Sequence, residues 1–282
     1  MPRLPLNPTA VWGVVKELRV AGDDFRPLLV SGAPEHAQAL RGVLVEGGDP
    51  GAVRDLSGRA PSAYDLEGAR VLVHLVDGVE AGDADEETLR FAGRKEVEAI
   101  CVLVGAPVGE APDVPHVLAT DVIAVAPGEP LPFEAIAGRV ADRAGEAGHQ
   151  LAARLPTLRP AVVDDIVKTF SLQNGVLGVA IFIPGADFPV LTLNQIRMVL
   201  RIASAHGEEI DRERIVEVLS VVAAGLGFRT VARQFAGAVP GLGWAVKGGV
   251  AYTGTRALGE AATAYFAAGG TRMLRGSVRP RS

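Results

Sequence analysis

Short apolar runs alternate with longer amphipathic segments through the first half of this 282-residue chain. The runs at 71–76 and 100–104 are almost wholly apolar, which is typical of strands buried on both faces of a parallel sheet. This alternation of β and α units predicts a doubly wound α/β domain. The predicted strands are 27–30, 52–56, 69–76, 99–104 and 122–125, and the predicted helices are 33–45, 85–95 and 133–155.

The pattern changes after Pro160, where strand signals stop and long amphipathic or apolar helical segments follow. Glycine and proline breakers separate these segments, so we expect an all-α second domain. The predicted helices are 161–182, 191–206, 211–224, 228–238 and 242–268. The expected domain plan is a helical extension at 1–24, an α/β domain at 25–155, a helical domain at 156–268 and a disordered basic tail at 269–282.

The net charge of −5 is unevenly distributed. Residues 1–150 hold 13 Lys/Arg and 24 Asp/Glu, a net charge of −11, whereas residues 151–282 hold 15 and 9, a net charge of +6. The acidic first half disfavours nucleic acid as a partner, while the basic second half suits an anionic surface. The one cysteine, Cys101, excludes an intrachain disulfide and fits a reducing, cytoplasmic compartment.

The first predicted strand leads through Ser31 and Gly32 into a helix, which is the setting of a phosphate-binding loop, G-x-x-x-x-G-K-[ST]. Counted from Gly32, the motif's second Gly, its Lys and its Ser/Thr are replaced by Ala37, Gln38 and Ala39. The side chains that would contact phosphate and magnesium are therefore missing. A D-x-x-G motif is nevertheless present at the end of the second strand, from Asp55 to Gly58.

This order of elements resembles a small Era-like or Ras-like GTPase domain. In that family D-x-x-G follows the third strand, and N-K-x-D follows the fifth and reads guanine; the corresponding position here reads Gly105-Ala106-Pro107-Val108. The resemblance implies a P-loop-GTPase-like parallel sheet that has lost its phosphoryl-transfer chemistry, a pseudo-GTPase without cofactor, metal or catalytic residues. The alternative is a domain that still binds GTP with magnesium at Gly32. Its remaining nucleotide-site candidates are Gly32, Asp55 and Gly58.

A second resemblance covers roughly residues 155–267. The segments 171–175 (Ser-Leu-Gln-Asn-Gly) and 183–203 (from Ile-Pro-Gly-Ala-Asp-Phe-Pro to Arg-Ile-Ala) look like the GTPase-associated domain of unknown function 697, the YcjF-like domain. This domain is found fused to Era-like GTPase domains or to degenerate ones. The family is bacterial and often membrane-associated, so the resemblance implies architecture and little mechanism.

Polar residues of this region share one face of the helix predicted at 191–206, by i, i+3 and i, i+4 spacing. Asp187 lies in the preceding turn and can cap the helix or pair with Arg197. Two interpretations stay open, a polar network that braces the helices and a binding site for a ligand or a lipid headgroup. The residues concerned are Asp187, Asn194, Gln195, Arg197 and Arg201.

Small residues recur every fourth position along the last predicted helix, and such ridges allow helix backbones to approach closely. This face suits packing within the domain, a homodimer or a membrane contact. Its members are Gly241, Ala245, Gly249, Thr253 and Ala257. The longest uncharged run, 169–186, includes polar residues and a proline, which favours core or interfacial helices over a membrane span.

The sequence contains no catalytic set, and its five histidines lack metal-ligand spacing. His74 and Cys101 fall within strands and are expected in the core, while the acidic cluster Asp83, Asp85, Glu86 and Glu87 is expected to form a solvated first helical turn. We therefore expect a non-catalytic cytoplasmic scaffold, peripheral to the inner membrane if it attaches to one. Its expected partner is a protein, a second copy or a membrane surface. The alternatives are a weak GTP-dependent switch and an integral membrane protein.

Overall fold

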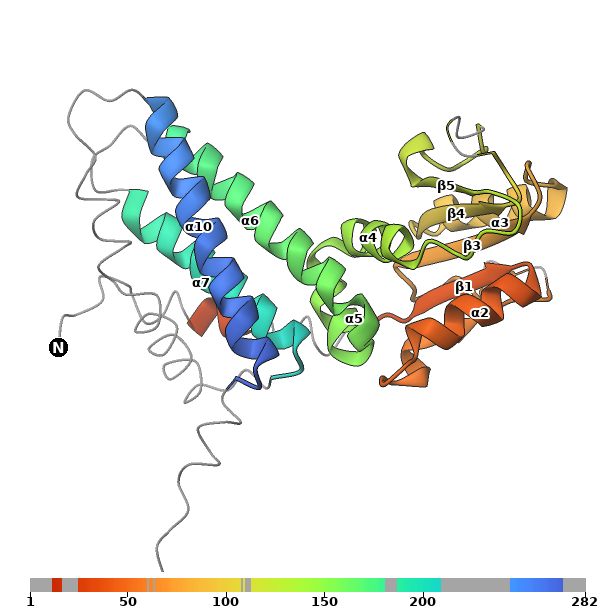
Figure 1. The fold of residues 1–282 in the computed structure, drawn as a ribbon, viewed down its shortest axis with the longest axis horizontal. Helices are drawn as coiled ribbons and strands as arrows, with labels where there is room; N and C mark the ends of the chain where they lie inside the picture. The colour runs from red at the N-terminus through yellow and green to blue at the C-terminus, as the bar shows by residue number, and fades with distance from the viewer. Residues whose placement is uncertain are drawn as a thin grey trace, which may run out of the picture. The chain divides into compact units, whose positions relative to one another are not determined.

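A computed structural model describes residues 12–16, 25–59, 61–62, 64–107, 109, 113–180, 187–208 and 244–270. The chain divides into two compact units, residues 24–162 and a second unit made of 1–23 with 163–282. We call them the α/β unit and the helical unit (Figure 1). The predicted fold class, α/β followed by all-α, is confirmed. The division falls in the first turn of α6 (Arg159–Ala180), shortly after the predicted boundary at 155/156.

Five parallel strands form the sheet of the α/β unit, in the order β2-β1-β3-β4-β5. All five strands were predicted. Because β2 and β3 lie on opposite sides of β1, the chain reverses its direction of travel across the sheet between β1 and β3, which is the switch point where doubly wound sheets bind ligands. The strands are β1 (Leu28–Gly32), β2 (Val53–Asp55), β3 (Val71–Asp77), β4 (Glu98–Val104) and β5 (Val122–Val125).

Helices cover both faces of this sheet. Because β1 pairs with β3 in register, Leu29 and Leu72 share one face, where they pack with Ala92 of α3 (Asp83–Arg94). The opposite face is covered by α2 (Pro34–Leu44) and by α4 (Phe133–Ala144), which packs on β3 and β4. The predicted single helix 133–155 is wrong: Gly145, with φ of 53°, ends α4, and a short turn leads to α5 (Gly148–Arg154).

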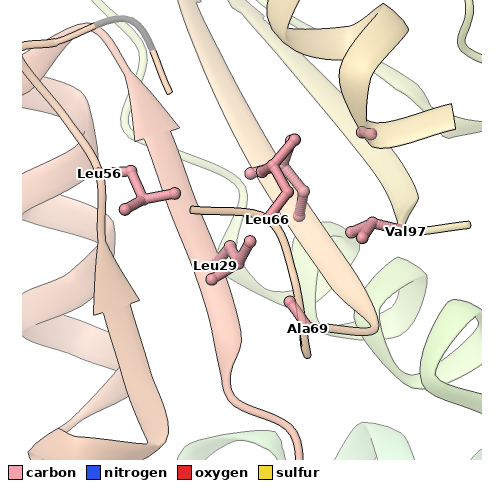
Figure 2. Close-up of a cluster of buried hydrophobic side chains, with 7 residues drawn as sticks. Leu29, Leu56, Leu66, Ala69 and Val97 are labelled. Carbon is pink, nitrogen blue, oxygen red and sulfur yellow. The ribbon is translucent and has the colours of Figure 1, made fainter. Parts of the chain in front are cut away.

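The connection from β2 to β3 crosses the sheet with turns and no helix among its described residues. Its Leu66 side chain is fully buried and takes the place that a crossover helix would occupy (Figure 2). Arg59 holds the connection closed through two hydrogen bonds to the Asp65 carboxylate, of 2.6 and 2.8 Å. The buried cluster beneath it is formed by Leu29, Leu56, Leu66, Ala69, Leu72, Ala92 and Val97.

The described helices of the helical unit are the greater part of α6, α7 (Asp187–Ala205), α10 (Trp244–Ala267) and the short helical stretch 12–16. The end of α6 and the starts of α7 and α10 lie at the same end of the unit (Figure 1). None of the helices in the described ranges is long and apolar enough to cross a bilayer. The predicted helices 211–224 and 228–238, and most of the predicted tail, lie outside these ranges.

Candidate functional site

The connection between β1 and α2 is one residue long, because β1 ends at Gly32 and α2 begins at Pro34. A phosphate loop needs several residues to turn successive backbone N–H groups around an anion. Here Gly32 lies against β3: its φ is 97°, and a Cβ on it would be 1.9 Å from the Leu75 carbonyl oxygen. The sequence identified the missing side chains, and the structure adds that the loop itself is absent.

The backbone donors at the start of α2 are also depleted. Ala33 N–H donates to the Leu75 carbonyl at 2.8 Å, and Pro34 has no N–H to offer. Glu35 then places a carboxylate in the first helical turn, where an anion would otherwise be stabilised by the helix dipole. The amino end of α2 lies at the switch point but is poorly equipped to hold phosphate.

The D-x-x-G motif closes onto this same connection. Asp55 ends β2, and its carboxylate accepts a hydrogen bond from the Ser57 backbone N–H at 2.8 Å, as turn residues do. Gly58 N–H reaches the Gly32 carbonyl at 3.5 Å, and Pro34 Cγ lies 3.6 Å from the position a Gly58 Cβ would take. The three predicted nucleotide-site residues are thus brought together, with a direct backbone contact between Gly58 and Gly32 and the Pro34 ring beside Gly58.

The segment after β4, where the resemblance to a GTPase would place a guanine-reading motif, packs into the core. Gly105 N–H donates to the Val125 carbonyl, and Ala106 is fully buried in a cluster with Leu103 and Val114. Neither residue offers a side-chain amide or carboxylate to a base.

A buried hydrogen-bonded chain links the sheet to α3. Ser31 Oγ lies 2.7 Å from His74 Nδ1, and His74 Nε2 lies 2.9 Å from Asp85 Oδ1. A carboxylate only accepts, so Nε2 carries a proton and, in the neutral imidazole, the Ser31 hydroxyl donates to Nδ1. The expectation that His74 is a satisfied core residue is confirmed, since it is 2% exposed with both ring nitrogens bonded.

The expectation that Asp85 is merely solvated is wrong. Besides His74, it accepts a hydrogen bond from the Gly82 backbone N–H at the start of α3. The His74 hydrogen bond lowers the pKa of the Asp85 carboxyl below its ordinary value. Its helical-turn position suggested a solvent-facing charge, because the sequence gives no sign that His74 lies beneath.

Serine, histidine and aspartate in a chain invite comparison with a nucleophilic triad. The Ser31 side chain has no exposure to solvent, so no substrate can reach its hydroxyl. Cys101, the register partner of His74 on β4, is also buried as expected, and burial together with the Asp85 charge raises the pKa of its thiol to about 12. The thiol stays protonated and unreactive, so this row of residues stabilises the sheet.

The helical unit contains a polar network that joins its three long helices. Asn174 of α6 donates to Thr255 Oγ1 of α10 at 2.8 Å and accepts from Asn194 Nδ2 of α7 at 2.8 Å. Gln195 Nε2 also donates to Thr255 Oγ1, at 3.2 Å. Asn174 and Thr255 are fully buried, and Asn194 is nearly so. These side chains hydrogen-bond to one another across three helices, which favours the brace over the ligand site.

The structure divides the predicted polar set. Asn194 and Gln195 belong to the network, whereas the Arg201 guanidinium lies over the Phe170 ring, 5.2 Å from its centroid. Asp187 was expected in a turn before the helix but is the first residue of α7, and its side chain lies outside the described residues. Asn174 and Thr255 belong to the network but were not among the predicted site residues. Asn174 could have been found, because it is a polar residue among the apolar positions of α6.

The predicted small-residue ridge faces away from the packed side of α10. Gly249, Thr253 and Ala257 are exposed, while Gly241 and the side chain of Ala245 lie outside the described residues. The helices instead approach at Gly248, where an added Cβ would lie 2.5 Å from Val179 and 2.9 Å from the Gly175 carbonyl. Packing within the chain therefore uses another face of α10, on which Gly248, Ala251, Thr255 and Gly259 are buried, and the oligomer or membrane role of the ridge remains a prediction.

Among the described residues, no three His, Cys, Asp or Glu side chains come close enough together to hold a metal ion. Comparison of the chain with protein-family models, curated proteins and solved structures finds no match.

Proposed function

We propose that this protein is a non-catalytic pseudo-GTPase scaffold, in which a nucleotide-binding fold presents a protein-binding face and the helical unit attaches to a membrane surface or to a second copy. The observation that carries the proposal is the one-residue connection between β1 and α2, with Ala33 N–H bonded to β3. Phosphoryl transfer depends on a loop that positions phosphate and magnesium. A connection this short supports the loss of that chemistry.

The D-x-x-G motif on β2 and the resemblance of the helical region to the YcjF-like domain favour descent from a GTPase of this kind. The sheet has five parallel strands, with D-x-x-G on the second strand rather than the third. We place the protein in a bacterial cytoplasm, peripheral to the inner membrane, on the same resemblance. Its α/β unit is acidic and suits protein partners rather than nucleic acid.

Thermal unfolding of the full-length protein with and without excess Mg-GTP tests the proposal. A ligand present at ~100 times its Kd adds ~2.7 kcal/mol to the state that binds it. We expect no shift. An upward shift with Mg-GTP and not with magnesium alone would instead support a GTP-dependent switch that binds through Gly32 and the start of α2.

Nucleotide binding could be lost because the connection between β1 and α2 is too short or because the motif side chains are missing. A variant with these side chains restored separates the two causes. Ala37→Gly, Gln38→Lys and Ala39→Ser together rebuild the missing positions without lengthening the connection. If the short connection prevents binding, this triple variant also shows no shift with Mg-GTP. A shift in the triple variant alone would mean that only the side chains were missing.

A further inference from the structure

We propose that one end of the helical unit enters the outer part of an anionic lipid bilayer. We call it the uncharged end, and it comprises residues 169–180 of α6, 187–196 of α7 and 244–255 of α10. These segments lie together at the end where α6 finishes and the other two helices start (Figure 1). The inference rests on the membrane-surface part of the proposed function and names the surface that makes the contact.

The first observation is that this end is almost free of charge. Residues 169–180 contain no charged side chain, residues 187–196 contain only Asp187, and residues 244–255 contain only Lys247. Ordinary water-facing helices carry charged residues on the face opposite the core. The distal parts of the same helices do so, with Asp164, Arg256 and Glu260 among them.

The second observation is that polar side chains make the buried contacts of this end while large apolar side chains are exposed on it. Asn174, Asn194 and Thr255 join the helices in the interior, whereas Leu172 and Val176 are 51% and 66% exposed, beside the exposed polar side chains of Gln173 and Thr253. Polar residues directed inward, small residues at the helix contacts and apolar residues outward are what helices in an apolar medium require.

The exposed large apolar side chains of the described long helices all belong to this end. Leu172 and Val176 are one turn apart on α6, and Val190, 46% exposed, lies in the first turn of α7 at the same end. The exposed large apolar residues of the α/β unit lie singly on separate elements, as is normal for a protein surface. Exposed apolar side chains that gather at one end of a unit favour a contact with an apolar partner.

The third observation concerns the kind of surface. Moving away from the uncharged end, the next charged residue is basic on each helix: the exposed Lys168 on α6, the half-buried Arg197 on α7 and Arg256 on α10, which pairs with Glu260 at 2.8 Å. A basic collar around an apolar tip matches an anionic headgroup layer above an acyl layer. The uncharged part of α6 is about 18 Å long at 1.5 Å per residue, which is enough for one leaflet and too short for a span.

Flotation of the full-length protein with phosphatidylglycerol-containing vesicles and with pure phosphatidylcholine vesicles tests this assignment. The variant Leu172→Gln/Val176→Gln removes apolar surface without changing charge, and Val79→Gln/Leu118→Gln is the matched control on exposed residues of the α/β unit. We expect the wild type to float with anionic vesicles and to be released by salt. The first variant should bind about tenfold more weakly, and the control should bind like the wild type.

Equal binding by both double variants would overturn the assignment and leave membrane attachment to another surface. No flotation of the wild type would remove both the assignment and the membrane part of the proposed function, while the loss of nucleotide binding is judged separately by the Mg-GTP experiment. A change in oligomeric state of the Leu172→Gln/Val176→Gln variant, without a change in flotation, would identify the end as a self-association face and contradict the proposal.

A second measurement leaves the uncharged end unaltered. The chain has two tryptophans, and Trp12→Phe leaves Trp244, the first residue of α10, as the only reporter. On anionic vesicles we expect its emission to shift to shorter wavelength and to be quenched by brominated acyl chains. Vesicle binding without either change would show that this end stays in water.

Discussion

At the scale of single residues, His74 links the interior of the sheet to α3 by hydrogen bonds. It is the buried titratable side chain of β3, and it fixes one neighbour on each side, Ser31 on β1 and Asp85 on α3. Leaving one of these groups without its partner in the interior costs more free energy than the bond itself contributes. The arrangement stabilises the fold and also makes part of its stability depend on pH.

We predict that Asp85→Asn lowers the free energy of unfolding by about 1.5–3 kcal/mol at neutral pH, the usual contribution of a hydrogen bond to a charged group. The pKa of Asp85 is lower in the folded protein than in the unfolded chain, so the folded state binds fewer protons. The contribution is complete above the unfolded pKa of about 3.9 and is lost as pH falls through the folded pKa. Denaturant unfolding at a series of pH values measures it.

The matched control for this experiment is Asp83→Asn, which changes an exposed carboxylate in the same helical turn. The difference between wild type and Asp85→Asn should shrink as the medium is acidified below about pH 5, whereas the control should change stability little throughout. A difference for Asp85→Asn that stays constant down to strongly acidic pH would show that its charge is not what the folded state stabilises.

At the scale of elements, two neighbouring glycines of α10 look alike in the sequence but have different surroundings in the structure. Gly248 faces α6, where an added Cβ would meet Val179 and the Gly175 carbonyl, whereas Gly249 faces open space. We predict that Gly248→Ala destabilises the protein by about 1–3 kcal/mol through overpacking. Gly249→Ala should be neutral or stabilise by up to ~1 kcal/mol, because alanine favours a helix. Thermal unfolding of the two variants checks both values.

If Gly249→Ala destabilised the protein and Gly248→Ala did not, the ridge of small residues through Gly249 would be the packed face.

The comparison of Gly248 with Gly249 also shows what the sequence can and cannot predict. The ridge is recognisable in the sequence as a periodic pattern of small residues. Helix periodicity alone cannot tell which of two neighbouring faces of small residues packs against another helix, and here the contact of Gly248 with Gly175 identifies the packed face. The strands were predictable because β3 and β4 are apolar on both faces.

Contacts between distant segments account for the other differences. Nothing local to Asp85 indicates His74, and nothing local to Thr255 indicates Asn174, because each pair is joined only by tertiary packing. The absence of the phosphate-contacting side chains can be recognised in the sequence. The short, closed β1–α2 connection cannot be predicted from it, because this connection depends on a hydrogen bond from Ala33 to Leu75 of a neighbouring strand.

At the scale of the whole molecule, the division into two units implies that damage to one core should be confined to it. Each unit has buried residues of its own, the sheet interior in one and the packed faces of α6, α7 and α10 in the other. Units with separate cores commonly unfold in separate steps. Variants that act deep within each unit therefore reveal how far the two are coupled.

We predict that Gly32→Ala lowers one thermal transition and Gly248→Ala lowers another. At Gly32, the added Cβ meets the Leu75 carbonyl oxygen at 1.9 Å in a backbone conformation that alanine rarely adopts, so we expect a loss of about 2–5 kcal/mol from the α/β unit. Gly42→Ala on α2, with open space around it, is the control and should not destabilise. In the double variant, calorimetry should give the sum of the two losses within about 0.5 kcal/mol. A clearly non-additive loss, or a single transition lowered by both variants, would show that the units fold as one cooperative body.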